Sequence, residues 1–259
     1  MPRTIFIRNY SAPGGGAYDA EMGDHELYFR QSLSGRDFAT GDPVARQMVN
    51  FSYAIGDRST GEALLVDPAY AVGELVDMVE ADGMAVVGAL VSHHHPDHVG
   101  GSLGGWTVEG LPALLDRISV PVHANRMEVP LVSSWTGVPE GDLVGHDGGD
   151  RLTVGGIEIE LLHTPGHTPG SQCFLVDGML VSGDTLFLEG CGRTDLPGSD
   201  PGDMYDSLRR LAGLPDSTAV FPGHQYSPSP SASMDNVRST NYALKPMDRE
   251  QWLRLFAGA

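Results

Sequence analysis

Short apolar runs recur along most of the chain, and several have the pattern of β-strands. Residues 157–162 alternate apolar and acidic positions, which is typical of a strand with one buried face. Residues 63–66 are continuously apolar, which is typical of a strand buried on both faces. On this pattern we expect strands at residues 26–30, 50–55, 63–66, 86–91, 120–123, 157–162, 172–176, 179–182 and 219–221.

Other apolar positions recur at helical spacing. Leu75, Val76 and Val79 would share one face of a helix, and Gly83 is suited to follow its end. The same spacing predicts further helices. They are expected at residues 111–118, 204–211 and 246–256. Pro246 is compatible with the start of one of them, because proline is well tolerated at the first position of a helix. Loops are expected where glycine, serine and proline gather, at residues 11–24 and 227–233.

The order of these elements favours two sheets covered by helices. A single doubly wound sheet would need longer helices between its strands than the pattern contains. No segment resembles a linker, so we expect a single domain over residues 1–259, with its core at 25–226 and a C-terminal loop and helix at 227–259. Residues 100–149 are rich in glycine and the least regular, and we expect a long loop region there.

Composition and charge exclude several classes of protein. The 259 residues include 34 acidic and 16 basic side chains, and the net charge of −18 opposes binding to nucleic-acid backbones. No apolar run reaches the roughly 18 residues of a membrane span, and the N-terminal residues lack the apolar stretch of a secretory signal. Two cysteines make no disulfide framework. We therefore expect a cytoplasmic protein with no nucleic-acid or membrane partner.

The first candidate for chemistry is a histidine cluster that directly follows an expected strand. Four of the ten histidines fall within residues 93–98. In an extended segment His93 and His95 point to the same side, because side chains alternate. Asp97 and His98 follow after the chain turns and can approach from another direction. Imidazole and carboxylate groups of this kind suit zinc, iron or manganese.

Three more residues of ligand type stand beside glycine or proline at the ends of expected strands. His167 lies in a Pro/Gly turn, Asp184 follows one apolar strand, and His224 follows another. Each of them alone is weak evidence, because a single strand-end Asp or His is usually a turn residue or a satisfied polar group. Together they indicate a binding site built on loops that a rigid scaffold holds.

The seven residues, in this order, resemble the metal signature of the metallo-β-lactamase superfamily over roughly residues 50–226. The resemblance implies an αββα sandwich, an α/β fold of two mixed sheets flanked by helices. It also implies two metal positions with one shared carboxylate. His93, His95 and His167 would hold the first metal, Asp97, His98 and His224 the second, and Asp184 would bridge them.

The resemblance further implies a metallo-hydrolase with two divalent metal ions, and we expect Zn²⁺. Two metals about 3.5–4 Å apart share a hydroxide and lower its pKa toward neutrality, which makes a nucleophile at pH 7. Asp97 and Asp184 are the expected catalytic residues, Asp97 by orienting the nucleophile and Asp184 by bridging the metals.

Two intracellular branches of the superfamily share further motifs with this chain, and both act on thiol conjugates. The segments 93–98 (HHHPDH), 183–187 (GDTLF) and 223–226 (GHQY) are similar to glyoxalase II, which hydrolyses a glutathione thioester. This similarity implies a small-molecule thioester as substrate. Only 35 residues follow His224, fewer than the helical C-terminal domain of long glyoxalase II enzymes.

The segment 190–196 (GCGRTDL) resembles persulfide dioxygenases instead. That resemblance implies a single Fe²⁺ held by His93, His167 and Asp184. The ligand residues are common to both branches, so they do not decide between them. Another ester, a lactone or an amide is a further alternative substrate for the same site.

Some residues outside the signature have two interpretations. Arg193 and Tyr226 are candidate substrate-binding residues. For Arg193 the alternative is an ordinary salt bridge, and substrate binding is slightly favoured. For Tyr226 a buried structural hydroxyl is an equal alternative. His94 should face away from its neighbours and pack behind the site. Residues 100–149 could form a lid or a surface excursion packed by its own side chains. The sequence does not predict the oligomeric state, and a homo-oligomer is one possibility.

Overall fold

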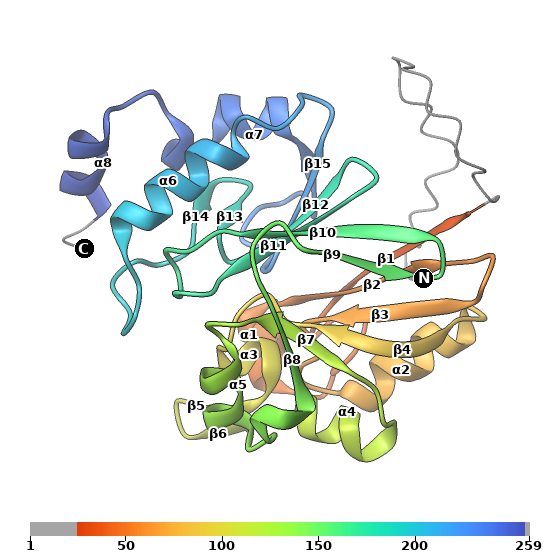
Figure 1. Ribbon diagram of the computed structural model, residues 1–259. Helices are drawn as coiled ribbons and strands as arrows, with labels where there is room; N and C mark the ends of the chain where they lie inside the picture. Colours follow the sequence, from red (N-terminus) through yellow and green to blue (C-terminus); the bar gives the residue numbers. More distant parts are fainter. Residues whose placement is uncertain (1–24, 257–259) are drawn as a thin grey trace.

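Two six-stranded mixed sheets lie face to face, and helices cover the outer face of each (Figure 1). This computed structural model describes residues 25–256. The expected αββα sandwich is confirmed. The loop expected at residues 11–24 lies outside the described residues. Among the described residues, no helix has the length and apolar character needed to cross a membrane.

The first sheet has the order β1-β2-β3-β4-β7-β8. Its first three strands pair antiparallel, and the pairs from β3 onward are parallel. The strands are β1 (Leu27–Leu33), β2 (Phe51–Asp57), β3 (Glu62–Val66), β4 (Ala85–Leu90), β7 (Val122–Asn125) and β8 (Leu143–His146). The helices on this side are α1 (Pro43–Met48), α2 (Val72–Ala81), α3 (Pro96–Val99), α4 (Leu111–Arg117) and α5 (Val129–Thr136).

The second sheet has the order β16-β15-β12-β11-β10-β9, and only its β12–β15 pair is parallel. The strands are β9 (Arg151–Val154), β10 (Ile157–His163), β11 (Gln172–Val176), β12 (Met179–Gly183), β15 (Ala219–Pro222) and β16 (Ala232–Ser233). Its helices are α6 (Pro201–Leu211), α7 (Met234–Thr240) and α8 (Arg249–Phe256). Two hairpins stand apart, β5 (Gly101–Leu103) with β6 (Trp106–Val108) and β13 (Leu186–Phe187) with β14 (Gly190–Cys191).

Alternation along the strands of the first sheet divides the apolar core into layers. Phe51, Tyr53 and Ile55 of β2 face the second sheet, where they pack among its apolar side chains. Ala54, between them, faces the helices on the outer side. Both faces of β2 are therefore buried, which explains why apolar residues occupy consecutive positions on both of its faces from Tyr53 to Ile55.

Residues 100–149 contain more regular structure than the long loop region that the sequence predicted. The helix expected at residues 111–118 is α4, and the strand expected at residues 120–123 is β7, which begins two residues later. The strand β8 and the helix α5 were not predicted. Both strands are only four residues long and carry histidine, asparagine or glycine, so their apolar period is weak. Whether any part of this region covers the site remains a prediction.

The C-terminal part also contains more regular structure than expected. The segment after residue 226 includes β16 and α7 before the final helix. That helix, α8, begins at Arg249 rather than at Pro246. The helix expected around Val76 is α2, and Gly83 follows its end with a φ of +80°, as predicted.

Candidate metal centre

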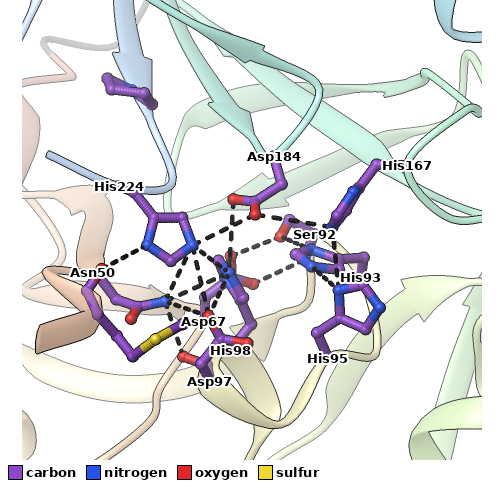
Figure 2. A network of polar contacts seen from close by, with 12 residues as sticks. Asn50, Asp67, Ser92, His93, His95, Asp97, His98, His167, Asp184 and His224 are labelled. Carbon is purple, nitrogen blue, oxygen red and sulfur yellow. Dashed lines mark hydrogen bonds and ion pairs between the residues drawn. The ribbon is translucent and has the colours of Figure 1, made fainter. Parts of the chain in front are cut away.

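All seven residues of the predicted signature meet at one edge of the two sheets, beyond the carboxyl ends of several strands (Figure 2). Parallel strands end on the same side of a sheet, which is where loops build binding sites. His93 and His95 follow β4, Asp97 and His98 lie in α3, His167 lies between β10 and β11, Asp184 follows β12, and His224 follows β15.

The first group of candidate ligands consists of three imidazoles. The Nε2 atom of His93 lies 3.0 Å from Nδ1 of His95, and Nε2 of His167 lies 3.0 Å from the same Nδ1. The three ring nitrogens therefore converge from two separate loops. This convergence is the arrangement that a metal ion with nitrogen ligands requires.

The second group combines one carboxylate and two imidazoles. The Nε2 atoms of His98 and His224 are 3.3 Å apart, and Oδ2 of Asp97 lies 3.6 Å and 3.4 Å from them. All three residues are buried. The three ligand atoms therefore lie close enough together to bind one metal ion.

Asp184 lies between the two groups. Its Oδ2 atom is 3.7 Å from Nε2 of His167 in the first group and 3.3 Å from Nε2 of His224 in the second. Its Oδ1 atom is buried and has no hydrogen-bond partner among the described residues. It lies 3.5 Å from Nε2 of His98, beyond the ordinary length of a hydrogen bond. A buried carboxylate oxygen that accepts no hydrogen bond is costly, and a metal cation would satisfy it, so the residues present fit a metal group.

Glycine is required beside this carboxylate. A Cβ atom on Gly223 would collide with Oδ1 of Asp184, and one on Gly192 would collide with its backbone carbonyl. The absence of these side chains lets Asp184 approach His224 and His167 closely.

Backbone carbonyls fix the orientation of two of the imidazoles. Nδ1 of His167 lies 2.9 Å from the carbonyl of Arg193, and Nδ1 of His224 lies 2.8 Å from that of Met48. A carbonyl only accepts hydrogen bonds, so both Nδ1 atoms donate. The lone pair is then on Nε2, which is the atom that faces the centre.

Asp67 fixes two more imidazoles, and the sequence analysis did not find it. Its Oδ2 atom accepts from Nδ1 of His98 at 2.9 Å and from the hydroxyl of Ser92 at 2.6 Å. Because that hydroxyl proton is used, Ser92 Oγ accepts from Nδ1 of His93 at 3.0 Å. An Asp-Pro pair at the end of a buried strand was the one available signal for this residue.

Asn50 is a second residue that the sequence analysis missed. Its Nδ2 atom donates to the carbonyl and to Oδ2 of Asp97, each at 3.1 Å. The hydroxyl of Tyr70 donates to Oδ1 of Asn50 at 3.0 Å and so fixes which end of the amide faces Asp97. Figure 2 shows Asn50 between Asp97 and His224.

Burial and mutual repulsion keep the first group neutral. Burial, with the nearby imidazoles of His98 and His95, lowers the pKa of His93 well below its usual value. Burial and His167 lower the pKa of His95 to about 3. Neutral imidazole is the form that binds metal.

The second group has the opposite balance. Burial alone would lower the pKa of His98, but Asp97 and Asp184 outweigh burial and raise it to about 10. Burial alone would raise the pKa of Asp184, but His224 and His98 hold it well below its usual value. The carboxylates are thus ionised, and metal binding at this group must displace a proton from histidine.

The two predicted substrate-binding residues lie at the rim of the centre. The ring of Tyr226 stacks on that of His224, with centroids 4.8 Å apart, and 56% of the residue is exposed. The guanidinium of Arg193 is exposed and pairs with Asp195 at 2.7 Å. Arg193 contacts the centre only through its carbonyl, which accepts from His167.

The family of the chain follows from its sequence as a whole. Residues 46–224 match the family model described as the metallo-beta-lactamase superfamily. The chain belongs to this superfamily. The expected family and the expected enzyme class, a hydrolase of the metallo-β-lactamase superfamily, are confirmed.

Similar proteins within the superfamily include hydroxyacylglutathione hydrolases. The chain is 40% identical to that of Methylobacillus flagellatus over 64% of this chain and 59% of the relative. It is 36% identical to that of Aeromonas salmonicida over 73% of this chain and 64% of the relative. The chain therefore spans less than two thirds of the length of these two relatives. A probable polyketide biosynthesis zinc-dependent hydrolase, BaeB of Bacillus velezensis, is 29% identical over 79% of this chain and 85% of the relative.

Solved structures of the superfamily share the fold over most of the chain. The structure of ETHE1 from Myxococcus xanthus superposes with a TM-score of 0.72 and 27% identity, covering 89% of this chain and 90% of that one. The structure of TTHA1623 in a di-iron-bound form gives a TM-score of 0.62 and 28% identity, covering 75% of this chain and 95% of that one.

Proposed function

We propose that this superfamily member binds two divalent metal ions, Zn²⁺ by expectation, and hydrolyses a small-molecule thioester. The observation that carries the proposal is the position of Asp184, whose carboxylate contacts His167 of the first candidate group and both imidazoles of the second. The sequence similarity to hydroxyacylglutathione hydrolases supports the thioester class. The similarity to a hydrolase described as zinc-dependent supports the metal.

The proposed ligands follow the two groups. His93, His95 and His167 would hold the first metal, Asp97, His98 and His224 the second, and Asp184 both. Bound metals of this kind lower the pKa of a coordinated water toward neutrality and polarise the carbonyl under attack. A thiol leaving group has a pKa of about 8.5, so the chain does not need a strong general acid to expel it.

The chain's own residues would orient the reacting groups. Asn50 holds the carboxylate of Asp97 in place, with Oδ2 directed at the imidazoles of His98 and His224, where Asp97 would help to orient the nucleophile. The exposed ring of Tyr226 beside His224 is placed to contact substrate with its hydroxyl. The guanidinium of Arg193 would bind a carboxylate of the thiol carrier only by exchanging its partner Asp195.

A single-iron persulfide dioxygenase is the second candidate, and one observation favours it. The segment that resembles those enzymes lies against the centre: Gly192 packs on Asp184 and His167, and the carbonyl of Arg193 orients His167. His93, His167 and Asp184 would be the iron ligands. A hydrolase of another ester, a lactone or an amide would use the same centre.

Assays with and without oxygen test the proposal. Release of thiol from a panel of acyl-thiols, including acylglutathiones, is measured under nitrogen. Oxygen uptake is measured separately with a low-molecular-weight persulfide. The proposal expects thioester cleavage without oxygen. Oxygen uptake with sulfite formation, and no thioester turnover with any carrier, would overturn it in favour of the dioxygenase.

A further inference from the structure

A buried carboxylate outside the ligand signature joins two of the ligand loops. Glu128 immediately precedes α5 and is fully buried. Its region was expected to be a loop, and no motif pointed to it. The carboxylate lies between the segment that carries His93 and His95 and the segment that carries His167.

Each oxygen of Glu128 accepts from a different ligand loop. Oε2 accepts from the backbone amide of His94 at 2.8 Å and from its Nδ1 atom at 2.6 Å. Oε1 accepts from the hydroxyl of Thr168 at 2.7 Å and from the backbone amide of Gly170 at 2.7 Å. His94 stands between two candidate ligands, and Thr168 directly follows the third.

The charge of Glu128 makes these contacts strong. Burial alone would raise the pKa of Glu128, but the contacts from His94, together with the hydrogen bonds from Thr168 and Gly170, outweigh burial and lower it. The carboxylate is thus ionised in a water-excluded position and accepts four hydrogen bonds. Charge-assisted hydrogen bonds are roughly twice as strong as neutral ones, and removing one partner of a buried set leaves the others unsatisfied.

We propose that Glu128 is a positioning residue that sets the distance between the His93–His95 segment and His167, and thereby the affinity of this imidazole group for metal. The inference rests on the metal part of the proposed function. Glu128 itself does not face the centre, because all four of its hydrogen bonds go to the two loops behind it. Partners behind metal ligands typically change metal affinity by about 10- to 100-fold when they are removed.

The chain contains a matched control for a buried carboxylate. Asp57 is also fully buried and accepts from the backbone amides of Ser59 and Gly156 and from the Ser59 hydroxyl. It lies at the far end of β2, where it contacts none of the seven candidate ligands. Asp57→Asn therefore reproduces the loss of a buried charge without touching the ligand loops.

The test measures Co²⁺ affinity in a His224→Ala background, which weakens the second group and leaves the three imidazoles of the first. Glu128→Gln and Asp57→Asn are compared in this background by chelator competition and by the visible absorption of bound Co²⁺. We expect Glu128→Gln to weaken Co²⁺ binding at least tenfold and to change the absorption. We expect Asp57→Asn to leave both unchanged, whatever its effect on thermal unfolding.

A milder pair of variants covers the case in which Glu128→Gln does not fold. Thr168→Val removes one of the four hydrogen bonds, and Thr168→Ser retains the hydroxyl that makes it. Weaker Co²⁺ binding in the valine variant, restored in the serine variant, supports the role of Glu128.

Each outcome has a separate meaning. If Glu128→Gln binds Co²⁺ as tightly as the His224→Ala parent, the positioning role is overturned. If Glu128→Gln does not fold, equal Co²⁺ affinity in Thr168→Val and Thr168→Ser overturns it instead. An equal loss in Asp57→Asn would overturn it as well. A wild-type chain that binds no Co²⁺ would instead overturn the metal part of the proposed function.

Discussion

Oδ2 of Asp184 lies 3.3 Å from Nε2 of His224, although 40 positions separate the two residues in the chain. The parallel pairing of β12 with β15 explains this contact. The amide of Gly223 donates to the carbonyl of Gly183 at 2.8 Å, so the next residue of each strand leaves the sheet at the same place. The register of two strands thus determines a contact within the candidate metal centre.

The shared position of Asp184 predicts how metal content responds to substitution. Asp184→Ala should lower the affinity for both metals, because its carboxylate contacts both groups. His224→Ala should weaken only the second. Metal analysis after dialysis against a weak chelator compares the two variants. If Asp184→Ala kept both metals and its activity, the bridging assignment would be wrong.

Gly223 offers a test of the close approach without removing a ligand. Gly223→Ala should displace the Asp184 carboxylate, because the new Cβ atom would collide with Oδ1. We expect a loss of metal affinity of about tenfold or more. Gly141→Ala is the matched control, because a Cβ atom there meets no neighbour within 4 Å. Equal metal affinity in both variants would contradict the geometry described for Asp184.

The two groups should differ in how their metal affinity depends on pH. The pKa of His98 is raised to about 10, so in the metal-free protein this imidazole holds a proton at pH 7 that a metal must displace. Affinity at the second group should therefore rise with pH, by up to about tenfold per unit for each proton displaced. The pKa of His95 is lowered to about 3, so the first group should show little dependence between pH 6 and 8.

Variants that isolate one group allow this comparison. His93→Ala leaves the second group and His224→Ala leaves the first. Calorimetric titration with metal, in buffers of different ionisation enthalpy, counts the protons released. Proton release in the His93→Ala variant alone is expected. Equal release in both variants would refute the electrostatic difference between the groups.

The strands and the ligands were predictable from the sequence for separate reasons. Residues 172–176 form β11 with the predicted bounds, because burial makes the four positions after Gln172 apolar. The seven candidate ligands were recognisable because four of them cluster within residues 93–98 directly after a strand, and His167, Asp184 and His224 stand beside glycine or proline at strand ends. In both cases the signal is local in the chain.

The residues behind the ligands had no such signal. Glu128 is one acidic residue in an irregular segment, and its partners lie in two loops, with His94 34 residues away and Thr168 40 residues away. Asn50 begins an apolar strand, where a single polar residue is unremarkable. Their roles follow from tertiary packing alone. The strand β8 was missed for a different reason, because four residues are too few to establish a period, and for the same reason β7 was expected two residues too early.

Two exposed tryptophans test whether the region after α3 contacts substrate. Trp106 lies in the β5–β6 hairpin, which leaves directly from the ligand segment, and Trp135 lies in α5. We predict that Trp106→Ala and Trp135→Ala change KM across a panel of thioesters and leave metal content unchanged. Unchanged KM values with every thioester would show that these two side chains do not contact substrate.

The metal content of the chain tests the central claim most directly. Protein is purified without oxygen and without added metal, and its metals are counted per chain by elemental analysis and native mass spectrometry. A centre with two groups joined by Asp184 predicts two metal ions per chain, and zinc is expected. A single iron per chain, with the second group empty, would contradict the account and favour the oxygenase.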